Sequence, residues 1–172
     1  MGHSIGYIMG LLAGILVGVG VVALLFKLRV VDTTFDERQE RARGQAYKYG
    51  FWTLLACLML YGISDEALGR WCDVLTGVIL CGAVAITVFA AVCIVKDAYL
   101  SLKEKPRTVM TLFAVITLLN LGIGVLHLLD GSVVEDGVLT AGAVNLICGV
   151  MVLVILVIYM VNYLLARRED GE

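Results

Sequence analysis

The sequence predicts an all-α membrane protein, a helix bundle of five transmembrane helices with the N-terminus outside and the C-terminus in the cytoplasm. Hydrophobic residues make up 60% of the 172 residues and charged residues only 16%, against about 45–50% and about 25% in soluble domains. Five long apolar runs alternate with short polar segments, and about 20 such residues form a helix that crosses a bilayer. Basic residues gather in alternate polar segments, which sets the orientation.

The first predicted span is residues 4–26, which carry no charge. It lacks the basic leading region and the A-x-A site of a secretory signal peptide, so we predict that it is retained. Small residues recur at every fourth position of this span: Gly6, Gly10, Gly14 and Gly18. Because small residues let helices approach closely in lipid, this stripe predicts helix packing within the monomer, with a homo-oligomer as the alternative.

Residues 47–64 form the second predicted span, and residues 34–44 before them form a predicted cytoplasmic amphipathic helix. Thr34 followed by Glu37 fits a capping box at its start. The spacing of Glu37 and Arg41 predicts an ion pair one helical turn apart. Gly44 either ends this helix or lies inside one that continues into the second span.

The remaining predicted spans are residues 74–95, 108–129 and 137–164. The first two are charge-free runs of typical spanning length. The last run stays free of charge as far as residue 166, which is longer than an upright crossing needs. We therefore expect the fifth helix to tilt or to emerge from the membrane at its end.

The distribution of Lys and Arg predicts the orientation, because positive charge accumulates on the cytoplasmic side. Of the 13 basic residues, only Arg70 falls in a segment that this topology places outside. The first cytoplasmic segment, the second one and the C-terminal tail hold all the others. The sequence therefore predicts a multi-pass protein of the cell (cytoplasmic) membrane.

Polar residues inside the spans are few, and they are the candidates for an intramembrane site. Asn120 and His127 share a face of the fourth span, and Asn145 lies in the fifth. At about 1.5 Å per residue both asparagines lie roughly 12–14 Å from the outer ends of their runs, so we predict a hydrogen bond between them. A polar site for a small ligand or ion is the alternative. For His127 we expect a structural role, and a proton or metal site beside Asp130 is the alternative.

The first cytoplasmic segment carries the residues most suited to contact a partner. They are charged and fall on the predicted amphipathic helix: Asp36, Glu37, Arg38, Arg41 and Arg43. Basic residues beside a membrane are attracted to anionic lipid headgroups. The sequence therefore predicts contact with anionic headgroups, and a cytosolic or membrane protein partner is the second prediction for this helix.

The same segment carries a resemblance. Asp36-Glu-Arg-Gln39, then Arg43-Gly44, then Ala46-Tyr-Lys-Tyr-Gly-Phe-Trp52 resembles a motif of a family of small multi-span membrane proteins of Gram-positive bacteria. The resemblance covers residues 36–52 and is otherwise general, in hydrophobicity and number of spans. It implies a bacterial cytoplasmic-membrane protein, and it implies no activity, cofactor or catalytic residue.

The chain lacks the short motifs that mark common enzymes, namely H-E-x-x-H, G-x-S-x-G, G-x-x-x-x-G-K and C-x-x-C. We therefore expect that the protein is not an enzyme and has no cofactor and no metal site. The absence of a basic, aromatic-rich patch on a soluble fold argues against nucleic-acid binding. We predict an accessory, regulatory or scaffold protein that acts through its first cytoplasmic loop. The alternative is a small transporter or channel subunit with a polar site between the fourth and fifth helices.

Overall fold

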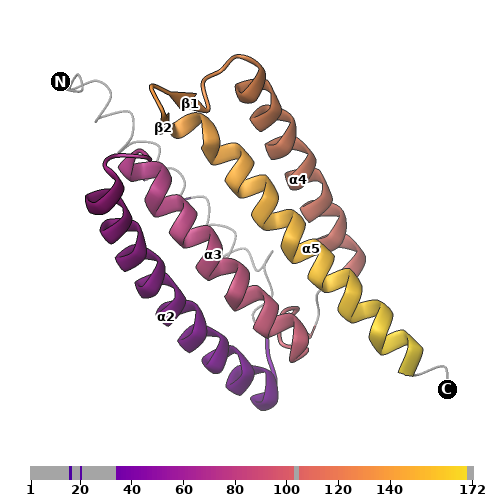
Figure 1. The fold of residues 1–172 in the computed structure, drawn as a ribbon. Helices are drawn as coiled ribbons and strands as arrows, with labels where there is room; N and C mark the ends of the chain where they lie inside the picture. Colours follow the sequence, from indigo (N-terminus) through magenta and orange to yellow (C-terminus); the bar gives the residue numbers. More distant parts are fainter. Residues whose placement is uncertain (1–15, 17–19, 21–33, 103–104, 170–172) are drawn as a thin grey trace.

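The computed structural model describes Leu16, Gly20, residues 34–102 and residues 105–169. In this part of the chain the long helices are α2 (Glu37–Leu68), α3 (Val74–Val95), α4 (Pro106–Leu129) and α5 (Val144–Glu169). They lie side by side in the order α2, α3, α5, α4 (Figure 1). The connection from α4 to α5 holds a short hairpin of β1 (Val134–Glu135) and β2 (Val138–Leu139), then the 3-10 turn η1 (Ala141–Ala143).

Two names describe the ends of this bundle. The hairpin end is formed by the α2–α3 connection, residues 69–73, and the α4–α5 connection, residues 130–143. The basic end is formed by the start of α2, the described part of the α3–α4 connection (residues 96–102 and 105), the start of α4 and the end of α5. Figure 1 shows the hairpin at one end and the C-terminus beyond the other.

Each of these four helices is long and apolar enough to cross a membrane, which confirms the predicted helical class and indicates a membrane-embedded protein. Large apolar side chains point outward from them, including Leu118, which is 72% exposed. Such faces are unfavourable in water and suit contact with lipid. The predicted first span, residues 4–26, lies outside the described residues apart from Leu16 and Gly20.

The predicted boundaries agree with the structure for α3 and differ elsewhere. The predicted span 74–95 is α3 itself, and the span 108–129 begins two residues earlier because Pro106 fits the first turn of a helix. The predictions for residues 34–44 and 47–64 describe one continuous helix, α2, of 32 residues. Gly44 therefore does not end a helix.

Packing against α3 explains why α2 continues. Ala42, Ala46 and Gly50 are buried and recur at every fourth position of α2. A Cβ added at Gly50 would lie 3.4 Å from the carbonyl oxygen of Ala85 on α3. The small side chains let the two helices approach closely over their length, and this contact holds Gly44 in the helix.

The predicted span 137–164 is wrong at its start, because residues 138–139 form β2 and α5 begins at Val144. Asp136 and Gly137 both have positive φ angles, 51° and 79°, as a two-residue type I′ hairpin turn requires. β2 also joins the α2–α3 connection, since the Leu139 amide donates to Trp71 and its carbonyl accepts from Asp73. The hairpin end is therefore closed by a small sheet.

Two reciprocal contacts hold α4 against α5. A Cβ at Gly124 would lie 2.6 Å from the side chain of Leu146, and a Cβ at Gly149 would lie 2.7 Å from that of Leu121. The side chain of a leucine on the facing helix thus packs directly against each glycine. Between α3 and α5, buried Ala90 and Ile94 of α3 pack with Ile155 of α5 in an apolar cluster.

Candidate interaction site at the basic end

The start of α2 is fixed by a capping box that differs from the predicted one. The Gln39 amide donates to Oδ1 of Asp36 at 2.7 Å, and the Asp36 amide donates to Oε1 of Gln39 at 3.3 Å. The two residues thus satisfy each other's backbone groups at the first helical turn. The box predicted for Thr34 and Glu37 is wrong, because the helix begins at Glu37 and Asp36 is its cap.

The end of α3 forms a Schellman motif and presents carbonyl oxygens to α2. The Ala98 amide donates to Cys93 and the Asp97 amide donates to Ile94, which is the paired pattern of that motif. Asp97 occupies the left-handed position with a φ angle of 54°, where glycine is usual. Nε2 of Gln39 then donates to the carbonyl oxygens of Asp97 and Leu100, at 2.9 and 3.3 Å.

Arg43 is the second side chain of α2 that binds this connection. Its Nη1 donates to the carbonyl oxygen of Ala98 at 3.1 Å, and its guanidinium lies 4.1 Å from the ring centre of Phe35. A guanidinium over an aromatic ring is attracted by the negative face of the ring. Arg43 was predicted as a partner or lipid contact, and the structure shows it engaged within the chain.

The other charged residues of this segment point outward. Arg38 lies 3.9 Å from Asp97, and Arg41 lies 3.8 Å from Glu37. The side chains in these two pairs are 74–91% exposed, and such pairs contribute about 0–1 kcal/mol at most. Of the five predicted contact residues, Arg43 and the exposed Asp36 make contacts that stabilise the fold, whereas Glu37, Arg38 and Arg41 make only exposed ion pairs.

The accessible charges line a groove of about 440 Å³ between α2 and the end of α3. Its charged side chains are Glu37, Arg38, Arg41 and Lys96. The Lys96 ammonium donates to Oε1 of Gln45 on α2, so both helices contribute to one polar surface. Gln39, Gln45 and Lys96 were not predicted as site residues, because their roles depend on contacts across more than 50 positions of sequence.

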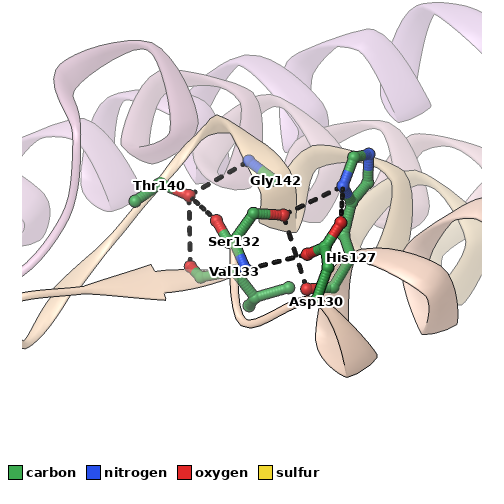
Figure 2. A network of polar contacts seen from close by, with 6 residues as sticks. All are labelled: His127, Asp130, Ser132, Val133, Thr140 and Gly142. Atoms are coloured by element: carbon green, nitrogen blue, oxygen red, sulfur yellow. Dashed lines mark hydrogen bonds and ion pairs between the residues drawn. The ribbon is translucent and has the colours of Figure 1, made fainter.

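A polar network at the hairpin end contains His127 (Figure 2). Nδ1 of His127 lies 3.0 Å from Oγ of Ser132 and 3.6 Å from Oδ2 of Asp130. In a Ser-His-Asp triad the serine and the carboxylate bond to opposite ring nitrogens, whereas here both lie beside Nδ1. The geometry therefore does not fit a Ser-His-Asp triad.

The same network closes the turn after α4. The Ser132 amide donates to Oδ1 of Asp130 at 2.9 Å, and the side chain and amide of Ser132 lower the pKa of Asp130 from its ordinary value. The Thr140 hydroxyl donates to the Ser132 carbonyl and accepts from the Gly142 amide at 3.2 Å. His127 thus helps to attach the hairpin to the end of α4. Among the described residues, no group of three or more His, Cys, Asp or Glu side chains is placed to hold a metal ion.

The predicted pairing of Asn120 with Asn145 is wrong. Nδ2 of Asn120 donates to the carbonyl oxygen of Ile116 in its own helix, at 2.9 Å. The leucine–glycine contacts set an α4–α5 register in which the two asparagines lie about five residues, or about 7 Å, apart along the helix axes. Asn145 lies in the first turn of α5 because that helix begins at Val144. The transporter interpretation stays a prediction.

The glycine stripe of the first span, Gly6 to Gly18, lies outside the described residues, so helix packing and self-association through it stay predictions. Compared with known protein families, with curated proteins and with solved structures, the chain matches none. The family resemblance of residues 36–52 also stays a prediction.

Proposed function

We propose that this chain is a non-catalytic accessory, regulatory or scaffold protein of the cell membrane that acts through the basic end. In the proposed topology five helices span the membrane, the N-terminus is outside, and the basic end faces the cytoplasm. The charges of the described residues support this orientation. Arg70 lies at the hairpin end, whereas α2, the α3–α4 connection and the start of α4 carry the other described basic side chains.

One observation carries the functional proposal. The exposed charges of Glu37, Arg38 and Arg41 stand on a helix whose start is fixed from the inside by Gln39 and Arg43. A flexible loop would lose conformational entropy on binding, whereas a surface held in place loses much less. The arrangement therefore suits recognition of a protein partner at the membrane surface.

Cross-linking in native membranes tests the proposal. A photoreactive amino acid in place of Arg38 is expected to capture one dominant protein partner. The matched control places the same amino acid at Arg70, an exposed arginine at the hairpin end, where that product should be missing. Capture of only lipid or other copies of the chain at position 38, or the same product from both positions, would contradict the proposal.

A further inference from the structure

We propose that the basic end holds a binding site for one anionic phospholipid, in the groove between α2 and α3. The inference rests on the membrane placement proposed above and needs no protein partner. Two adjoining hollows carry it. The first is the charged groove of about 440 Å³ described above, and the second is an apolar hollow of about 280 Å³ that includes Tyr49, Ala91 and Val92.

Val95 and Lys96 line both hollows, so the charged groove and the apolar hollow adjoin. A phospholipid has the same arrangement as these two hollows, because its charged headgroup is followed by an apolar acyl chain. The apolar hollow also opens outward, since Val95 is 66% exposed and Tyr49 is 54% exposed. A soluble anion would use only the charged part of this surface.

The charges of the groove favour an anion. Three basic side chains, those of Arg38, Arg41 and Lys96, line the groove with one acidic side chain, that of Glu37. Asp97 beside Arg38 adds a second carboxylate, so basic side chains remain in excess. The ion pairs that hold Arg38 and Arg41 are long and highly exposed, so they exchange readily for a phosphate. Arginine presents a planar fork of donors that matches phosphate oxygens, and basic pockets between membrane helices bind anionic headgroups.

The depth of the two hollows fits a lipid. α3 has 22 residues, and at about 1.5 Å per residue it just crosses a hydrocarbon core about 30 Å thick. Lys96, at its C-terminal end, therefore lies at the membrane boundary. Val92 on α3 and Tyr49 on α2 lie one helical turn inward of Lys96 and its partner Gln45. The headgroup would thus lie in the charged groove at the membrane boundary, and the acyl chain would lie in the apolar hollow one turn inward.

Native mass spectrometry of the purified full chain in detergent, with added phosphatidylglycerol or phosphatidylcholine, tests the site. We expect preferential retention of phosphatidylglycerol. Arg41→Gln should weaken this binding about fivefold, which is the typical effect of one basic residue near an anionic surface. The matched control is Arg107→Gln, which removes an exposed charge at the same end but outside the groove and should leave the binding within about twofold.

The apolar hollow has a test of its own. Val92→Trp should fill it and reduce retention of phosphatidylglycerol, whereas Leu118→Trp on the outward face of α4 should not. Equal retention of the two lipids, or equal losses for Arg41→Gln and Arg107→Gln, would overturn the inference. If either occurs while cross-linking at position 38 still captures one protein, the lipid site fails and the proposed function stands.

Discussion

The guanidinium of Arg43 donates to the carbonyl oxygen of Ala98 at 3.1 Å, and this bond joins the start of α2 to the connection between α3 and α4. Ala98 is fully buried, and its amide completes the motif that ends α3. The same guanidinium covers Phe35, just before α2. A single side chain thus ties three segments of the basic end together.

Arg43→Ala is expected to lower the free energy of unfolding by about 1.5–3 kcal/mol, because it removes a hydrogen bond from a charged donor. The free energy of unfolding of Arg43→Lys should lie between those of Arg43→Ala and the wild type, since lysine keeps the charge but lacks the planar group over Phe35. Denaturant unfolding in detergent micelles measures both. The control is Arg41→Ala, whose exposed pair should contribute about 0.5 kcal/mol or less. Equal losses for Arg41→Ala and Arg43→Ala would contradict the internal role of Arg43.

Asp36→Ala is expected to destabilise the chain by about 1 kcal/mol and to fray the first turn of α2, because it removes the helix cap. Hydrogen exchange at the amides of Gln39 and Glu40 measures the fraying. Asp36→Asn should preserve protection, since asparagine caps about as well as aspartate. Glu37→Ala is the control, because Glu37 belongs to the capping box expected from the sequence and not to the one in the structure. It should leave the exchange at these two amides nearly unchanged.

The helices were predictable because long charge-free runs have few other stable arrangements in a bilayer, and α3 was predicted at both of its ends. The union of residues 34–44 with residues 47–64 was left open, because Gly44 is compatible with either outcome. Contact of the Ala42, Ala46 and Gly50 face with α3 decides it, and this contact depends on residues far away in the sequence. Local pattern alone does not contain that information.

The candidate site was predicted in part for the same reason. The charged composition of residues 36–43 marked the segment, but it did not distinguish Arg43, which faces the chain, from Arg41, which faces outward. The carbonyl oxygens that Gln39 and Arg43 bind lie 55–61 residues further along the chain. The hairpin, by contrast, had a local signal, since Asp-Gly, here Asp136-Gly137, is a strong turn pattern between two short strands. The length of the apolar run after Gly137 favoured a helix instead.

The lowered pKa of Asp130 predicts a dependence of stability on pH. A carboxyl whose pKa is lower in the folded state contributes stability above its unfolded pKa, which is about 3.9, and loses it as the pH falls through the folded value. The contribution should therefore be complete at neutral pH, decline as the pH falls below about 4, and vanish only below the folded pKa. Thermal melts of the wild type and Asp130→Asn from pH 7 to pH 2 test it. The two melting temperatures should differ at neutral pH and converge in acid, and a constant difference would contradict the role of Asp130.

The α4–α5 interface gives a prediction with a control two residues away. Gly124→Ala places a Cβ 2.6 Å from the side chain of Leu146 and 3.0 Å from its backbone nitrogen, so the helices must move apart. We expect a loss of about 1–3 kcal/mol, as for other insertions into a packed interior. Gly122→Ala makes the same chemical change in the same helix with no atom within 4 Å, and it should be neutral or stabilising by up to about 1 kcal/mol. Unfolding in micelles compares the two variants. A loss of the same size in both would show that helix flexibility, rather than the close approach to Leu146, requires glycine in this part of α4.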